Sequence, residues 1–187
     1  MNRREILASL AALTASPALA QTAGMSAAGA YRFTFKSLHG EDIRLGDHAG
    51  KPMLICNTAS FCGFASQMHD LEMLHTRYGA RGLLVLGVPS GDFGGQEAAT
   101  EKEIEAQAVH QFGITFPLAA KTRVRGDDAH PFFKWALAEK PGDPPRWNFH
   151  KYLIDRRGLI AEVFWPTTKP TETRVIAAIA RVLDAKA

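Results

Sequence analysis

The two cysteines, Cys56 and Cys62, are the residues of this chain best suited to redox chemistry. Their spacing of six differs from the C-x-x-C of a thioredoxin-type redox pair and from the paired spacing of a structural zinc site. Two cysteines are also too few for a disulfide scaffold. The chemistry that remains is that of a single reactive thiol, whose thiolate form is the nucleophile.

The local sequence separates the two thiols. Cys56 ends the continuous apolar run 53–56, which predicts a buried strand and therefore an inert thiol. Cys62 lies in the segment 57–64, which leaves that strand and enters a predicted helix, where free backbone N–H groups favour a thiolate. From these residues alone, a buried inert Cys62 and a Cys56–Cys62 disulfide remain alternatives, although the disulfide would require strand and turn to fold back on themselves.

The seven histidines do not form a pattern that predicts a metal site. His69 and His75 are six residues apart and so do not share a helix face, and His110, His130 and His150 have no recognised ligand spacing. We therefore expect solvated or capping histidines and no bound metal.

The elements that position Cys62 can be predicted from hydrophobic patterning. Segments 31–35 and 43–45 predict a β-hairpin. The runs 53–56 and 83–88 are apolar throughout, as in strands that are buried on both faces. Apolar residues at spacings of three and four predict a helix over 64–79 between them, which gives a parallel βαβ unit.

The second half of the chain predicts three helices, over 97–111, over 130–139 and from Pro170 onward. Segments 149–154 and 159–164 flank a four-residue turn and predict an antiparallel hairpin. This order predicts an α/β fold of the thioredoxin arrangement, with an added N-terminal β-hairpin and a central mixed sheet flanked by helices.

Four ordered motifs, spread between about Phe33 and Leu183, carry a resemblance to a known family. The chain resembles the glutathione peroxidases in these segments: Asn57-Thr58-Ala59-Ser60-x-Cys62-Gly63-x-x-x-Gln67, Phe93-Gly94-x-Gln96-Glu97, Phe112-Gly113-Ile114-Thr115-Phe116-Pro117 and Trp147-Asn148-Phe149-x-Lys151-Tyr152-Leu153. The resemblance implies that Cys62 is the peroxidatic residue and that Gln96, Trp147 and Asn148 are its catalytic partners. Their amide and indole N–H groups are hydrogen-bond donors that would favour a thiolate and then a leaving oxyanion.

The resemblance further implies a thiol-dependent peroxidase that reduces hydrogen peroxide and organic hydroperoxides, lipid hydroperoxides included, through a Cys62 sulfenic acid. Glutathione or another thiol would be the reducing co-substrate, and no metal, flavin or nicotinamide is implied. A redox sensor without turnover, which would use the same Cys62 chemistry, is an alternative. A thioredoxin-fold thiol–disulfide or copper-handling protein is another, although it would require a second nearby thiol.

The chain departs from the family pattern in places that bear on its reductant and its assembly. Ala108 occupies the position of the resolving cysteine of thioredoxin-dependent members, which implies a one-cysteine enzyme. Ala65 and Met68 replace a Thr and a Tyr of the family's active-site helix. The segment between Trp135 and Trp147 is short, whereas tetrameric members carry an insertion there, so we expect a monomer with an open site.

The first 20 residues differ from the rest and predict a signal peptide. Arg3 and Arg4 precede the apolar stretch 6–15, and Ala18-Leu19-Ala20 is an A-x-A cleavage signal. We expect cleavage after Ala20, by the general secretory or a twin-arginine-like route, and a periplasmic or secreted protein. The expected division is a signal peptide at 1–20, a flexible lead-in at 21–30 and one domain at 31–187.

The composition of the 187 residues is typical of a globular protein, with 46% hydrophobic and 22% charged residues and a net charge of +3. The basic residues are scattered and form no run, so nucleic acid is not an expected partner. No apolar stretch approaches the roughly 18 residues of a membrane span, so stable membrane insertion is not expected.

Overall fold

A computed structural model describes residues 29–185, and the expected signal peptide and most of the expected lead-in therefore lie outside the described residues. Gly29 and Ala30, which were assigned to the lead-in, belong to the fold, because they open the 3-10 helix η1 (Gly29–Arg32) and Ala30 is fully buried. Within residues 29–185, no helix is both long and apolar enough to cross a membrane.

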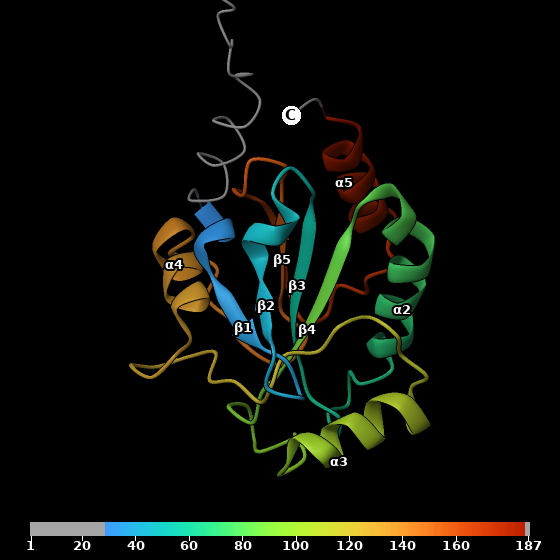
Figure 1. The fold of residues 1–187 in the computed structure, drawn as a ribbon, viewed down its shortest axis with the longest axis vertical. Coiled ribbons are helices and arrows are strands. Elements are labelled where there is room, and N and C mark those ends of the chain that lie inside the picture. The colour runs from blue at the N-terminus through green and yellow to red at the C-terminus, as the bar shows by residue number, and fades with distance from the viewer. Residues whose placement is uncertain (1–28, 186–187) are drawn as a thin grey trace, which may run out of the picture.

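A four-stranded mixed sheet forms the centre of the fold (Figure 1). Its strand order is β4-β3-β5-β6, with bounds β3 (Met53–Thr58), β4 (Leu84–Pro89), β5 (Lys151–Ile154) and β6 (Ile160–Phe164). The first two strands pair in parallel and the others antiparallel. All residues of β3 and β4 are buried, which confirms the prediction from their continuous apolar runs.

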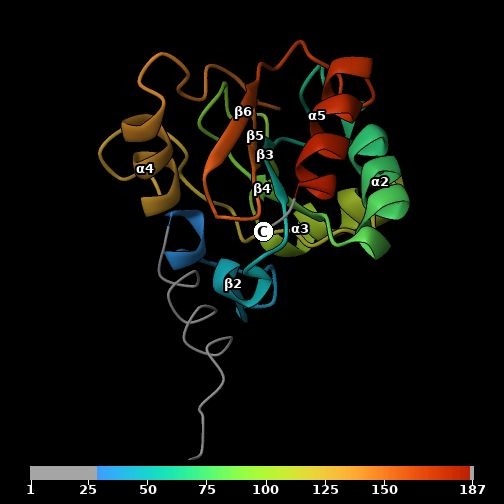
Figure 2. The same ribbon diagram turned by 90° about the horizontal axis from the view of Figure 1, so that it is seen from above.

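Helices cover both faces of this sheet and one of its ends. Figure 2 shows α2 (Gln67–Tyr78) and α5 (Thr173–Asp184) on one face and α4 (Pro131–Glu139) on the other. The helix α3 (Glu101–Ala106) and the π-helical turn η4 (Gln107–Gln111) lie across the lower end of the sheet in Figure 1. Side chains of β3 alternate between the two resulting cores, with Leu54 and Cys56 in one and Met53 and Ile55 in the other. The predicted α/β thioredoxin arrangement is confirmed.

The predicted N-terminal hairpin is present, but it forms a separate two-stranded sheet of β1 (Thr34–Lys36) and β2 (Asp42–Arg44), followed by the 3-10 helix η2 (Leu45–His48). The strand predicted at 31–35 begins later than expected, because Tyr31 lies in η1. Its hydroxyl donates to the Arg156 carbonyl at 2.9 Å and accepts from the Gly50 N–H at 3.1 Å. These partners, distant in the sequence, determine the backbone conformation at Tyr31. They override the local alternation of aromatic and polar residues in 31–35, which favours a strand.

Three helices begin later than the sequence predicts. The helix expected over 64–79 starts at Gln67, and a series of turns precedes it. The helix expected from 97 starts at Glu101, because Thr100 and Glu103 form a capping box in which each side chain bonds the other residue's backbone N–H. The last helix starts at Thr173, three residues after Pro170.

A lysine lies in the core of the sheet. Lys151, the first residue of β5, is 0% exposed and pairs with Cys56 of β3 in the strand register. Burial lowers the pKa of its amine to about 8, and charged groups on the surrounding elements modify that effect. The Cys56 thiol and the Asp70 and Glu172 carboxylates raise the pKa, whereas Arg174 lowers it.

We predict that this lysine makes stability rise with pH. The unfolded chain holds its proton up to about pH 10.4, whereas the folded chain releases it near pH 8. Between these values the unfolded state binds more protons, so the free energy of unfolding increases with pH. Relative to Lys151→Met, the wild-type protein should gain about 2 to 3 kcal/mol between pH 7.5 and 10.5 in urea denaturation. Parallel pH curves for the two proteins would contradict this.

Candidate active site

The four predicted site residues come from three segments that meet at one edge of the sheet. Cys62 follows the end of β3, Gln96 follows β4, and Trp147 and Asn148 precede β5. Because β3 and β4 are parallel and β5 runs antiparallel to β3, these three segments lie together at the end of the sheet that is lower in Figure 1. The carboxyl ends of parallel strands are the usual ligand-binding edge of an α/β sheet.

Cys62 lies just beneath the surface in the turns between β3 and α2. The residue is 7% exposed, whereas its neighbours Phe61 and Gly63 are exposed. Because α2 begins only at Gln67, the expectation that Cys62 stands at a helix N-terminus is corrected. One backbone donor still reaches its sulfur, since the Phe64 N–H donates to Cys62 Sγ at 3.4 Å.

Cys56 is a free thiol in a different environment. It is 0% exposed within β3, and burial raises the pKa of its thiol to about 12. Its Sγ donates to the Asn57 carbonyl at 3.6 Å. Cys62 is also free, so the two residues form no disulfide in this structure. The burial of Cys56 is as the apolar run predicts, and a thiol so enclosed is unsuited to react with solutes.

Gln96 and Asn148 are in direct contact. The Asn148 side-chain amide donates from Nδ2 to Gln96 Oε1 at 3.1 Å. The Gln96 backbone carbonyl accepts from the N–H of Phe61, the residue that precedes Cys62, at 3.0 Å. Gln96 therefore bonds both the cysteine segment and the asparagine segment of the predicted site.

Trp147 is placed by packing and remains accessible. Its ring lies 5.7 Å from that of the buried Phe93, and 41% of the residue is exposed. Among residues 29–185, neither Trp147 Nε1 nor Gln96 Nε2 donates to a protein acceptor. Within the described residues, both N–H groups are therefore without a protein partner, and neither donates to Cys62 Sγ.

Asn57 is a positioning residue that the sequence analysis recognised only as part of a motif. This buried residue at the end of β3 makes four hydrogen bonds to the turn 147–150. Its Nδ2 donates to the Trp147 carbonyl at 3.1 Å, and its Oδ1 accepts from the His150 N–H at 3.1 Å. Its backbone carbonyl accepts from the Phe149 N–H at 2.6 Å, and its own N–H donates to the His150 carbonyl at 3.2 Å.

Glu97 is a second such residue, and its place directly after Gln96 in a motif was the available signal. Its carboxylate is buried and accepts from the backbone N–H groups of Ser60 at 3.2 Å and of Ala98 at 2.8 Å. Burial raises the pKa of this carboxyl, although these hydrogen bonds oppose the change. Glu97 thus fixes the chain two residues before Cys62.

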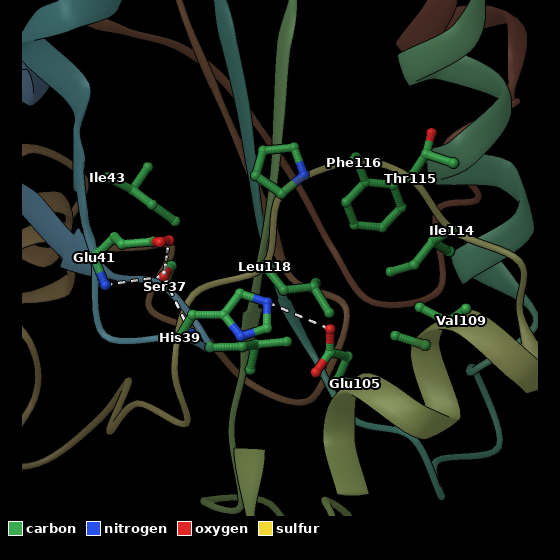
Figure 3. A pocket seen from close by; sticks show the side chains of 13 residues that line it. Ser37, His39, Glu41, Ile43, Glu105, Val109, Ile114, Thr115, Phe116 and Leu118 are labelled. Atoms are coloured by element: carbon green, nitrogen blue, oxygen red, sulfur yellow. Dashed lines mark hydrogen bonds and ion pairs between the residues drawn. The ribbon is translucent and has the colours of Figure 1, made fainter. Parts of the chain in front are cut away.

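A separate cavity lies away from these residues, between the β1–β2 hairpin, η4 and the segment 114–118 (Figure 3). Its volume is about 420 Å³, and His39 Nε2 lies 3.4 Å from the Glu105 carboxylate beside it. Ala108 lies in its wall, and neither cysteine does. Without a cysteine in its wall, the cavity is not the site of the predicted thiol chemistry. Residues 29–185 also contain no cluster of three or more side chains suited to hold a metal ion.

Comparison with known proteins agrees with the motifs. The sequence model of the glutathione peroxidases matches residues 30–137. The chain belongs to the glutathione peroxidase family. It is 40% identical to a hydroperoxy fatty acid reductase of Synechocystis sp., covering 76% of this chain and 89% of the relative. It is 38% identical to a glutathione peroxidase of Lactococcus lactis, with 76% and 92% covered.

Solved structures support the same assignment. The crystal structure of T. cruzi GPX1 superposes with a TM-score of 0.66 at 29% identity, covering 83% of this peroxidase and 97% of that chain. A thiol:disulfide interchange protein of Chlorobium tepidum superposes with a TM-score of 0.60 at 16% identity, covering 81% and 92%. The second likeness shows the thioredoxin fold alone.

We predict that Glu97 governs the reactivity of Cys62 through Ser60. Glu97→Ala would leave two buried N–H groups without an acceptor, which typically costs about 1 to 3 kcal/mol each in stability. Freed from this anchor, the Cys62 segment should react with hydrogen peroxide at least about 10-fold more slowly, since small misplacements of reacting groups are costly. Rapid quenching and mass spectrometry of the thiol would measure the rate. Glu97→Gln retains an acceptor oxygen, so its rate should lie between those of the wild-type protein and of Glu97→Ala. A wild-type rate in Glu97→Ala would refute the proposed effect of Glu97 on Cys62.

Proposed function

We propose that this peroxidase reduces hydroperoxides at Cys62, with Gln96, Trp147 and Asn148 as hydrogen-bond donors. The observation that carries the proposal is the convergence of these residues at the carboxyl edge of β3 and β4, where Gln96 bonds both other segments. A thiol that accepts a backbone hydrogen bond, at the same end of the sheet as two N–H donors without a protein acceptor among residues 29–185, is suited to heterolytic cleavage of an O–O bond.

In the proposed first step, the Cys62 thiolate attacks the distal peroxide oxygen in line with the O–O bond. The S–O bond forms as the O–O bond breaks, and the electron pair leaves with the proximal oxygen, which takes up a proton to become water or an alcohol. Cys62 becomes a sulfenic acid, so the sulfur is oxidised by two electrons while the peroxide is reduced. The Trp147 and Gln96 N–H groups would stabilise the developing oxyanion.

In the second stage, an external thiol condenses with the sulfenic acid, which releases water and leaves a mixed disulfide. A second external thiol then displaces Cys62 as a thiolate and leaves as the oxidised disulfide. Ala108 occupies the position at which related enzymes carry a resolving cysteine. The other cysteine of the chain, Cys56, is fully buried within β3 and so does not reach the sulfenic acid. We therefore infer a one-cysteine cycle, with glutathione or another thiol as reductant and no metal or organic cofactor.

We infer that organic hydroperoxides with apolar tails are substrates alongside hydrogen peroxide. Three aromatic side chains at or near the site edge are exposed, Phe61 by 58%, Trp147 by 41% and Trp165 by 48%. They offer apolar surface to a bulky substrate beside Cys62. The relationship to a hydroperoxy fatty acid reductase supports the same class.

Two alternatives differ from this proposal in what they require. A thiol–disulfide oxidoreductase would require a second reactive thiol, and Cys56, fully buried with its pKa raised to about 12, is unsuited to that task. A sensor without turnover would use the same Cys62 chemistry. Steady-state loss of peroxide with excess thiol distinguishes an enzyme from a sensor, which consumes peroxide only stoichiometrically.

We further propose that the protein acts as a monomer and outside the cytoplasm. The short segment between Trp135 and Trp147 supports the monomer, because it lacks the insertion of tetrameric members. The arginine pair, apolar stretch and A-x-A signal of residues 1–20 support export with cleavage after Ala20 to the periplasm or beyond.

We predict opposite results for the two cysteines. Cys62→Ser should reduce peroxide consumption to the uncatalysed rate, because the nucleophile is lost. Cys56→Ala should retain most of the activity and lower the free energy of unfolding by about 1 kcal/mol through lost packing. A coupled peroxide assay and urea denaturation measure the two effects. A folded but inactive Cys56→Ala would reverse the assignment.

We also predict that oxidised Cys62 finds no partner within the chain. After one equivalent of peroxide, mass spectrometry should find one added oxygen on Cys62, and with glutathione present it should find a mixed disulfide on the same residue. Thioredoxin, which attacks a preformed disulfide, should be a poor reductant. A product two hydrogens lighter, with Cys56 and Cys62 in one cross-linked peptide, would instead establish a two-cysteine cycle.

A further inference from the structure

Lys151 is a buried cation that the proposed chemistry does not use. It is 0% exposed, and within residues 29–185 no carboxylate lies within ion-pair distance of its amine. Its Nζ donates instead to two neutral acceptors, the Phe149 carbonyl at 2.7 Å and Gln67 Oε1 at 2.8 Å. Burial of an ammonium group without a counterion is costly, and an apolar side chain of the same length would pack there at a lower cost.

The first acceptor belongs to an unusual turn. Phe149 has a φ of 66° and is the only non-glycine residue of the described chain with a positive φ. This conformation is unfavourable for a residue with a side chain and persists only where the surroundings enforce it. At Phe149 both backbone groups are held, because its N–H donates to the Asn57 carbonyl at 2.6 Å and its carbonyl accepts from Lys151.

The orientation of Asn148 depends on that turn. Its side chain is fully buried and makes one hydrogen bond, from Nδ2 to Gln96, while its Oδ1 has no partner among residues 29–185. The side chain alone therefore does not fix its own direction. The backbone on its C-terminal side, which is held at Phe149, supplies the remaining constraint. Trp147 immediately precedes Asn148 in the same turn.

The second acceptor extends the contact to the helix that follows Cys62. Gln67 is the first residue of α2 and is buried, and its Nε2 donates to the Pro166 carbonyl at 2.7 Å. Lys151 thereby joins the turn that carries Trp147 and Asn148 to the start of α2 and to the segment after β6. One amine thus links two of the three chain segments that contribute to the proposed site, at Phe149 and at Gln67.

We propose that Lys151 is a positioning residue of the peroxidase site, which locks the left-handed turn at Phe149 and so holds Trp147 and Asn148 in place at the end of the sheet where Cys62 lies. This role rests on the proposed function, in which those two residues are donors to the reacting atoms. In this scheme Lys151 touches neither the Cys62 sulfur nor the substrate, and it acts only through the turn at Phe149.

The test compares Lys151→Met with a matched control, Arg156→Met. Arg156 is also bonded to two backbone carbonyls, Gly50 at 3.0 Å and Leu183 at 2.6 Å, but it lies beyond the opposite end of β5. The rate of Cys62 oxidation by hydrogen peroxide is measured on the reduced full chain by rapid quenching and mass spectrometry, well below the melting temperature of each variant. The indole N–H signal of Trp147 in a nitrogen-15 NMR spectrum reports the turn.

Lys151→Met should slow the oxidation of Cys62 about 10- to 100-fold and shift the Trp147 indole signal, with the melting temperature unchanged or higher. Arg156→Met should lower the melting temperature and leave the rate and the indole signal at their wild-type values. If Lys151→Met fails to fold, Gln67→Leu removes one acceptor from outside β5 and should shift the same signal and slow the reaction severalfold.

A double-mutant cycle separates this role from the proposed function. In the background Trp147→Phe/Asn148→Ala, adding Lys151→Met should change the rate less than about twofold, because the groups that it positions are absent. A wild-type rate or an unshifted indole signal in Lys151→Met, or equal slowing in both backgrounds, would overturn the positioning role. A wild-type rate in Trp147→Phe/Asn148→Ala would overturn the donor roles of the proposed function, and that of Lys151 with them.

Discussion

The site depends on the four hydrogen bonds that Asn57 makes to the turn 147–150. Asn57 is the penultimate residue of the central strand β3, all of whose residues are buried, so these bonds start from the core of the sheet. On one side of these bonds the chain leads to Cys62, and on the other it carries Trp147 and Asn148. Because Asn57 is fully buried, loss of one of these bonds would leave an unsatisfied polar group on it, and this cost keeps the two segments in one arrangement.

Two buried charged residues complete the frame around Cys62. Glu97 holds the backbone at Ser60, and Lys151 holds the carbonyl of Phe149. Neither forms an ion pair with the other, and each is bonded to backbone or amide groups. Such arrangements contribute little to net stability, since desolvation cancels much of the gain, but they impose directional constraints that apolar packing does not provide. A reaction that requires N–H groups at defined positions benefits from these constraints.

The sequence predicted the layers of the fold because their signals are local. Continuous apolar runs identified β3 and β4, and apolar residues at helical spacing identified α2. Predictions were wrong at element ends, where tertiary contacts compete with local preference. Tyr31 was expected in a strand, yet its hydroxyl bonds groups near residues 50 and 156 and the chain there forms a 3-10 helix. The late start of α3 reflects the capping box at Thr100, which leaves Glu97 free to reach Ser60.

By itself, the sequence determined the family, and it predicted the division of labour between Cys62 and Cys56 and the candidate donors, because residue type and motif order carry that information. Only the tertiary structure decided what holds these residues together. The contacts that do so join residues 37 positions apart at Ser60 and Glu97, 84 at Gln67 and Lys151, and 90 at Asn57 and Trp147. Local sequence cannot reveal such pairs. A buried polar or charged side chain holds two segments together only where folding brings its hydrogen-bond partners within bonding distance.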